Sequence, residues 1–325
     1  MKKRILFGLL MIAAVVAVLY GDFRLERMVE GVPDTPPPVG VSTRPVMTPP
    51  ADGGPDQPPP LSVMTGRVLT GLPVAMMIFL LLVAAVGEIT RLAEAAGMKL
   101  LAVSTLVGSV MLGTLPYWWQ ISRDVRPHGQ DVFPVFGFIV LLAFAEQMIR
   151  HRIEDAFRRI ACTLLAVMYL GVGAACLLAV RVDYGFGCFV AFLLAVKCTD
   201  MGAYFSGAAV GRHQMIPWLS PGKTWEGLLG GMIAAMGVTI AWVRFCPVPI
   251  QVRGHDIELW QAAVFGLLMA LAGQFADLCE SLLKRSASLK DSGQVVPGFG
   301  GLLDIIDSPL LAGPVALMLL RAVFG

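Results

Sequence analysis

Long apolar runs, separated by short polar segments, recur along almost the whole chain. There are nine of them, near residues 5–20, 68–87, 99–118, 132–149, 159–180, 183–207, 225–245, 259–283 and 302–323. Each approaches the roughly 20 residues that an α-helix needs to cross the hydrocarbon core of a bilayer. The runs are continuous, which excludes a β-barrel porin, whose strands alternate apolar and polar positions. The pattern predicts an all-α, polytopic integral membrane protein with about nine transmembrane helices.

The composition supports this fold class and narrows the function. Of the 325 residues, 56% are hydrophobic and 15% are charged, and the mean hydropathy is +0.73. A soluble domain carries about 25% charged residues, so a soluble enzyme and a disordered chain are both excluded. The net charge of +2 gives no reason to expect nucleic-acid binding. The six cysteines form no CxxC pair and read as free thiols packed among apolar residues.

The runs divide the chain into four parts. Residues 1–21 form a first transmembrane helix, expected as a signal-anchor, with a cleaved signal peptide as the alternative. Residues 22–66 form a proline-rich loop outside the cytoplasm, expected as a spacer, with a partner-binding segment as the alternative. Residues 67–180 hold helices two to five. Residues 181–325 hold helices six to nine and, as argued below, the catalytic half.

The distribution of basic residues predicts the orientation in the membrane. With the N-terminus inside, one set of loops holds 14 Lys and Arg residues, and the other holds 10, of which four lie in the long first loop. Basic residues in short loops favour the cytoplasmic side, whereas long loops carry little weight in this rule. We expect a multi-pass protein of the cell inner membrane, with its N-terminus and its active site in the cytoplasm.

The first polar cluster lies at the end of the sixth run. Lys197, Asp200 and Tyr204 are spaced by three and four residues, which places them on one helical face. Ionisable groups inside a membrane are costly to bury and are therefore functional candidates. The alternative is a Lys–Asp pair that only locks helix packing. The glycines that follow are expected to allow helices to approach closely.

The second cluster lies just before the seventh run. Thr224 or Ser220 is expected to cap the helix that follows, and Glu226 lies in its first turn. A helix N-terminus with a nearby lysine, here Lys223, binds phosphate well. The Gly-Lys-Thr triplet is not a P-loop, because position 217 is proline and no strand is expected before it. The alternative is a cap and a tight turn at the membrane interface.

The third cluster spans the eighth and ninth runs. Its first part shares one helical face by i, i+3, i+4, i+7 spacing: Asp277, Glu280, Ser281 and Lys284. After a proline- and glycine-rich loop, a second face follows: Asp304, Asp307 and Ser308. Two acidic faces that flank a glycine loop can hold a hard divalent cation, above all Mg²⁺ shared with substrate phosphates. Lys284, Arg285 and Lys290 would then neutralise the phosphates. The alternative is a structural network of salt bridges.

These residues resemble a known family. Residues 281–308 are similar in composition and spacing to the signature of the phosphatidate cytidylyltransferase (CDP-diacylglycerol synthase) family, and residues 220–227 and 200–204 resemble two further family blocks. The resemblance is specific over about 197–314, and before that it is one of hydropathy only. Glu88 matches an acidic residue that is usual at the end of the second run. Four positions depart from the family pattern: Phe299, Ile305, Ala208 and Gly222.

The resemblance implies a reaction in which CTP and phosphatidate give CDP-diacylglycerol and pyrophosphate. Asp277 and Asp304 would hold one or two Mg²⁺ ions, and Lys223 and Lys284 would complete the catalytic set. Further residues would bind substrate: Asp200, Tyr204, Ser220, Thr224, Glu226, Ser281, Arg285, Lys290, Asp291, Asp307 and Ser308. The implied partners are CTP, phosphatidate and membrane lipid, and a homodimer is included among the candidates.

The sequence leaves three other functions open. One is a different CTP-dependent lipid enzyme, such as a polyprenol or phytol kinase, which would leave CDP as product. Another is a transporter that uses the same buried carboxylates. A third is a catalytically silent membrane scaffold.

Overall fold

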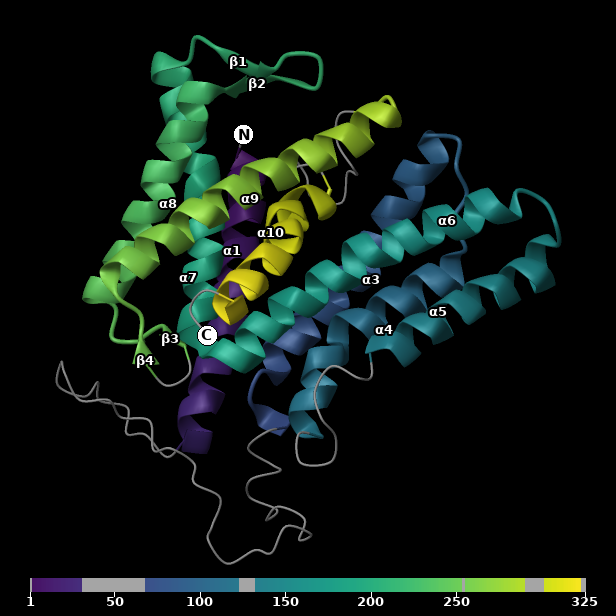
Figure 1. The fold of residues 1–325 in the computed structure, drawn as a ribbon, viewed down its shortest axis with the longest axis horizontal. Helices are drawn as coiled ribbons and strands as arrows, with labels where there is room; N and C mark the ends of the chain where they lie inside the picture. The colour runs from purple at the N-terminus through teal and green to yellow at the C-terminus, as the bar shows by residue number, and fades with distance from the viewer. Residues whose placement is uncertain (1, 31–67, 123–131, 253–254, 290–300, 323–325) are drawn as a thin grey trace, which may run out of the picture.

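The computed structural model describes residues 2–30, 68–122, 132–252, 255–289 and 301–322, and of these the side chains of 2–12 and 30 are left aside. The helices follow in chain order: α1 Lys2–Glu30, α3 Leu72–Ala95, α4 Ala102–Ile121, α5 Val132–Glu146, α6 Ala156–Val167, α7 Gly173–Val210, α8 Trp225–Phe245, α9 Leu259–Ser286 and α10 Leu303–Ala322. Two five-residue π-helices, η1 Gln147–His151 and η2 Met168–Val172, extend α5 and join α6 to α7. Figure 1 shows this helical assembly.

Two short antiparallel hairpins complete the described chain. The first pairs β1 Gln214–Ile216 with β2 Ser220–Thr224, and the second pairs β3 Gln251–Val252 with β4 His255–Asp256. They lie at opposite ends of the assembly (Figure 1). The first hairpin corrects the sequence analysis, which expected no strand before the Gly-Lys-Thr triplet. The triplet itself belongs to β2.

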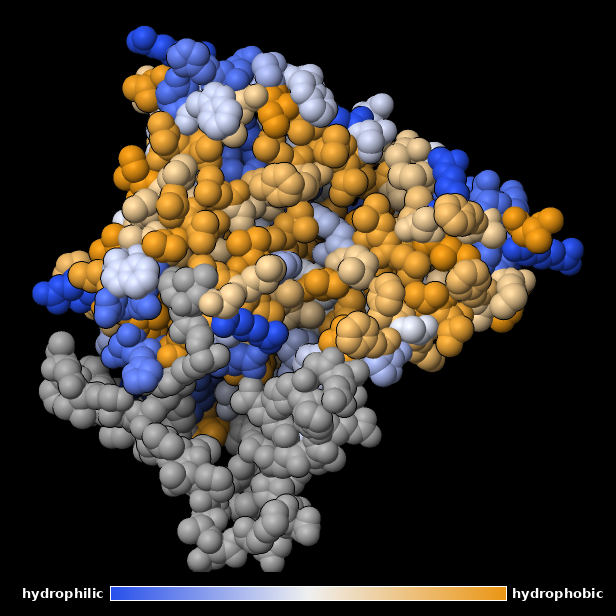
Figure 2. All heavy atoms as spheres, in the orientation of Figure 1, coloured by the Kyte–Doolittle hydropathy of each residue, from blue (hydrophilic) through white to orange (hydrophobic). Residues whose placement is uncertain are grey.

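The helices are those of a membrane protein. Six helical segments of the described chain are long and apolar enough to span a bilayer. Figure 2 shows hydrophobic side chains over the middle of one face and hydrophilic side chains gathered toward its ends. The all-α, polytopic fold class is therefore confirmed, and the count of nine spans stays a prediction.

The segment Ala156–Val210 contains two long helical stretches that meet at a kink. Together they cover 55 residues, which at 1.5 Å per residue is far longer than the roughly 30 Å of a bilayer core. Two runs were expected here, separated near residues 181–183, and the kink at Gly185 lies close to that point. Its backbone is not helical, with φ 80° and ψ 178°. A left-handed φ is accessible to glycine at little cost, so one glycine makes the turn between the two runs.

The core is built around α7, which packs against α8, α9 and α10. The approach to α8 is close. A Cβ atom added at Gly202 would lie 2.6 Å from the Ala234 Cβ and 2.8 Å from the Gly230 carbonyl oxygen. Small residues at such crossings let membrane helices approach at backbone distance. The sequence predicted close packing at Gly202, Gly207 and Gly211, and this prediction is confirmed at Gly202.

A buried ion pair fastens α1 to α7. Arg181 and Asp22 are 1% and 0% exposed in their side chains, and the Arg181 Nε donates to the Asp22 carboxylate. A second carboxylate, that of Glu26, lies 3.2 Å from the same guanidinium. Elsewhere α1 packs against α3.

We expect Asp22→Ala to lower the free energy of unfolding by about 3–5 kcal/mol, because it leaves the Arg181 charge buried without its main partner. Unfolding in mixed SDS micelles measures this. The matched control is Asp183→Ala, which removes the more exposed pair with Arg321 and should cost less than about 1 kcal/mol. Equal effects of the two variants would show that α1 is not held by this pair.

Candidate functional site

A cluster of charged side chains forms where α7, the β1–β2 hairpin, α9 and α10 meet. It contains five carboxylates and three lysines: Lys197, Asp200, Lys223, Asp277, Glu280, Lys284, Asp304 and Asp307. All three predicted polar clusters contribute to it. Figure 1 shows α9 and α10 side by side, and α10 also packs on α7.

Asp277 joins the hairpin to both helices. Its Oδ2 lies 3.1 Å from the Lys223 Nζ, which also donates to the Gln274 carbonyl oxygen at 3.3 Å. Its Oδ1 accepts a hydrogen bond from the Ser308 hydroxyl on α10. The Lys223 and Asp277 side chains are 19% and 25% exposed, so the pair is screened only in part by solvent. One carboxylate therefore ties β2, α9 and α10 together.

Lys284 makes the second link between α9 and α10. Its Nζ lies 2.7 Å from Glu280, one turn earlier on α9, and 3.3 Å from the Asp304 Oδ1. The other Asp304 oxygen accepts from the Gly301 backbone N–H at 2.8 Å. This second bond places Asp304 at the start of α10, where the exposed N–H groups of a helix favour negative charge.

Lys197 and Asp200 form the α7 wall of the cluster. Their side chains lie 3.6 Å apart, and the Lys197 Nζ donates to the Ile305 carbonyl oxygen at 3.0 Å. Asp277 lies close enough to Asp200 and Asp307 to interact electrostatically with both. The acidic groups of three helices thus repel one another across a small space.

Glu88 holds the beginning of α10 from the opposite side. It is 2% exposed on α3, and its two carboxylate oxygens accept from the Leu302 and Leu303 backbone N–H groups at 2.8 and 2.7 Å. It therefore caps the helix that carries Asp304 and Asp307. The sequence analysis noted Glu88 as a family match and gave it no role, although an acidic residue at the end of an apolar run was itself a signal.

The charge balance of the cluster suits a hard cation. When all groups are ionised, five carboxylates against three lysines leave an excess of two negative charges. The Asp200 Oδ1 and the Glu280 Oε1 are buried and have no hydrogen-bond partner among the described residues. Carboxylate oxygens are the ligands that Mg²⁺ prefers. The donor chemistry fits the ion, although no three acidic, histidine or cysteine side chains within the described ranges already converge as a preformed metal site.

The comparisons with known proteins agree with this geometry. Residues 61–323 match the family model described as the cytidylyltransferase family. The chain belongs to this family. The resemblance inferred from the sequence is therefore confirmed, and it extends beyond the segment that carried it.

Similar proteins include three named phosphatidate cytidylyltransferase. The one from Staphylococcus haemolyticus is 35% identical over 165 residues, which cover 51% of this chain and 60% of that protein. The one from Staphylococcus aureus is 35% identical over 184 residues, or 57% and 66% of the two chains. The one from Brucella suis is 37% identical over 163 residues, or 49% and 56%. In each case the matched segment spans less than two thirds of the relative.

Among the other predicted site residues of this cytidylyltransferase-family protein, Thr224 has the expected structural role. It is the N-cap of α8, and its Oγ1 accepts from the Gly227 N–H at 3.0 Å. Glu226 binds the turn before the hairpin, because it accepts from the Arg212 and His213 N–H groups and contacts the His213 Nδ1 at 2.6 Å. Ser220 begins β2.

Tyr204 lies about one turn beyond Asp200 on α7. It is 72% exposed, and its ring packs edge-on against Phe205. At about 100° per residue, Asp200 and Tyr204 lie on the same side of the helix, as the spacing predicted. Its assignment to substrate binding stays a prediction.

The remaining predicted residues lie at the edge of the described site or beyond it. Ser281 is half-buried on α9, and Arg285 is exposed, with its Nη1 3.5 Å from the Leu289 carbonyl oxygen. Lys290 and Asp291 lie outside the described residues, as does Phe299. Thus α9 and α10 carry the described core of the site, with β2 and α7 at its sides.

We expect Glu88→Ala to free the first turn of α10. The Leu302 and Leu303 amides should exchange hydrogen about 10-fold faster or more, since hydrogen bonds to a charged group contribute about 1.5–3 kcal/mol. Hydrogen exchange followed by mass spectrometry measures this, with Glu94→Ala on the exposed face of α3 as control. Unchanged exchange in Glu88→Ala would contradict the capping role.

Proposed function

We propose that this protein transfers the CMP group of CTP to phosphatidate, which gives CDP-diacylglycerol and pyrophosphate. The observation that carries the proposal is the pairing of Lys223 with Asp277 and of Lys284 with Asp304, at the junction of β2, α9 and α10. Membership of the cytidylyltransferase family and the names of the relatives support the choice of reaction and of substrates.

The reaction asks mainly for positioning and for neutralisation of charge. A phosphate oxygen of phosphatidate attacks the α-phosphorus of CTP, the bond from that phosphorus to the bridging oxygen breaks, and pyrophosphate leaves. Transfer at phosphorus needs little covalent participation by the protein. Holding two anionic reactants in line can itself remove several kcal/mol from the barrier.

The lysines are placed to meet the phosphates. In the structure, Lys223 and Lys284 are paired with carboxylates and are only 19% and 15% exposed. When the nucleotide binds, they exchange these partners for phosphate oxygens, and the charge that develops on departing pyrophosphate is stabilised in a site with limited solvent. Lys197 is held by the Ile305 carbonyl oxygen, so it supports the start of α10.

Asp277 and Asp304 are the residues that would hold one or two Mg²⁺ ions, with Asp200, Glu280 and Asp307 close by. The bound ion would supply positive charge to the nucleotide phosphates. The excess of two negative charges in the cluster and the two orphaned oxygens support this assignment. Ser308 positions Asp277 through its hydroxyl.

The distribution of basic loop residues supports placing this site at the cytoplasmic face of the inner membrane. That placement suits CTP, a soluble cytosolic nucleotide, and leaves the lipid to arrive from the inner leaflet.

We expect Asp277→Asn, Asp304→Asn, Lys223→Met and Lys284→Met each to reduce the transfer rate by at least about 100-fold, the scale of losing one preorganised charge in an active site. The assay counts label from α-labelled CTP in the lipid extract of membranes supplied with phosphatidate and Mg²⁺. Lys99→Met, an exposed residue outside the cluster, is the matched control. Full activity in the Asp277 and Lys223 variants would overturn the proposed site.

Removal of Mg²⁺ tests the metal assignment separately. We expect EDTA to abolish lipid labelling by the wild type and added Mg²⁺ to restore it. The reason is that the acidic cluster by itself lacks the positive charge needed to bind the phosphate groups of both substrates. Undiminished labelling in EDTA would contradict the assignment and leave the two lysines as the main source of positive charge.

A further inference from the structure

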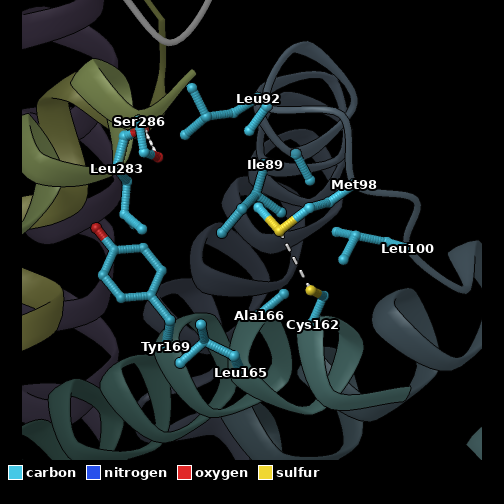
Figure 3. A pocket seen from close by; sticks show the side chains of 12 residues that line it. Ile89, Leu92, Met98, Leu100, Cys162, Leu165, Ala166, Tyr169, Leu283 and Ser286 are labelled. Carbon is cyan, nitrogen blue, oxygen red and sulfur yellow. Dashed lines mark hydrogen bonds between the residues drawn. The ribbon is translucent and has the colours of Figure 1, made fainter. Parts of the chain in front are cut away.

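An apolar groove lies directly beside the charged cluster. It is formed by α3, the segment joining α3 to α4, α6 with η2, and α9, and it holds about 610 Å³ of unfilled space, part of it open to the surroundings. Figure 3 shows the side chains that line it, among them Ile89, Leu92, Leu100, Cys162 and Leu283.

The groove shares two helices with the proposed active site. Leu283, in its wall, is the neighbour of Lys284 on α9, and Ile89 is the neighbour of Glu88 on α3. A ligand in the groove would therefore lie beside helices that carry or support the charged cluster.

One polar side chain stands between the two regions. Tyr169 lines the groove, and Figure 3 shows its hydroxyl directed toward α9. The hydroxyl is buried and has no hydrogen-bond partner in the part of the chain that the structure describes. It lies within electrostatic range of Asp307, Glu280 and Asp277. A buried hydroxyl without a partner costs free energy, so this one is available to a ligand.

The backbone at Tyr169 is also unusual. The residue belongs to η2, a five-residue π-helix between α6 and α7. Such segments are rare, and they occur frequently at functional sites.

The lining side chains indicate which class of ligand fits the groove. Apart from Tyr169 and Ser286, the lining side chains are apolar, and a polar ligand would lose its hydration there without compensation. Leu165, in the wall, is 65% exposed, and the adjacent Met168 is 44% exposed. On a membrane-spanning helix such residues meet lipid, so the groove is open to hydrocarbon chains.

We infer that this groove binds one hydrocarbon chain of the lipid phosphate substrate and that the Tyr169 hydroxyl donates a hydrogen bond to an oxygen of its headgroup. The inference rests on the proposed function and adds to it the lipid subsite. Each methylene group buried contributes about 0.8 kcal/mol to binding, which favours long chains over short ones.

Photocrosslinking tests the occupancy of the groove without turnover. The probe is phosphatidate with a diazirine at the end of one acyl chain, added to the full-length protein in nanodiscs. We expect crosslinked peptides from residues 89–100, 162–169 and 283–286, and we expect excess dioleoyl phosphatidate to suppress them more than dioleoyl phosphatidylcholine does. Crosslinks elsewhere, or equal suppression by the two lipids, would overturn the inference.

Two variants test the consequences for kinetics. Ala96→Phe places a ring in the wall of the groove, whereas Ala95→Phe, the control, places it at the exposed neighbouring position. We expect only Ala96→Phe to raise KM for dioleoyl phosphatidate. The expected increase is about 10-fold, which corresponds to the displacement of about two methylene groups of the acyl chain from the groove. KM for CTP should not change, and KM for dihexanoyl phosphatidate should change little. An equal effect of both variants, or an equal effect on both lipids, would count against the subsite.

Tyr169→Phe removes only the hydroxyl. We expect kcat/KM for phosphatidate to fall by about 3- to 10-fold, the effect of one hydrogen bond, with KM for CTP unchanged. Wild-type kcat/KM would contradict the assigned contact.

These results separate the subsite from the proposed function. If the wild type transfers label to lipid but the crosslinks lie elsewhere, the inference fails and the function stands. If the wild type labels no lipid phosphate while the groove still crosslinks competitively, the function fails and the groove remains a lipid site.

Discussion

The structure depends on the packing of five carboxylates with three lysines at the end of a helical membrane domain. Like charges in a partly dehydrated space are costly, so these groups can share it only if each is paired or neutralised. Lys223 and Lys284 neutralise part of the charge and also join β2 to α9 and α9 to α10. The remaining negative charge is what would attract a cation in the proposed mechanism, together with the anionic substrate that the cation accompanies.

Other features of the chain serve to hold these charges in place. Glu88 caps the start of α10 from α3, and Lys197 holds the Ile305 carbonyl oxygen from α7. Thr224 is the N-cap of α8, and Lys223 directly precedes it. The lysine is therefore held at the N-terminus of that helix. The apolar groove lies beside this charged region, on α3 and α9. In the proposed reaction, a soluble nucleotide and a lipid would approach the same carboxylates from different phases.

The sequence predicted the elements whose spacing is local. The spacing on α9 correctly placed Asp277, Glu280 and Lys284 on a common side. The cap of α8 was narrowed to Thr224 or Ser220, and the structure has Thr224. The sequence alone could not place Glu88 against α10, because that contact joins residues more than 200 positions apart. The fold class followed from hydropathy alone. The break expected near residues 181–183 is a kink at Gly185, where one glycine turns the chain without a loop.

The most direct measurement of the central claim follows the fate of each phosphorus of CTP. Membranes containing the wild-type protein, phosphatidate and Mg²⁺ receive CTP labelled either at the α- or at the γ-phosphorus. The account predicts α-label in the lipid extract and γ-label in pyrophosphate, because the lysines and carboxylates serve attack at the α-phosphorus. Label from the γ-phosphorus in the lipid, with CDP as the soluble product, would show a kinase and contradict the account.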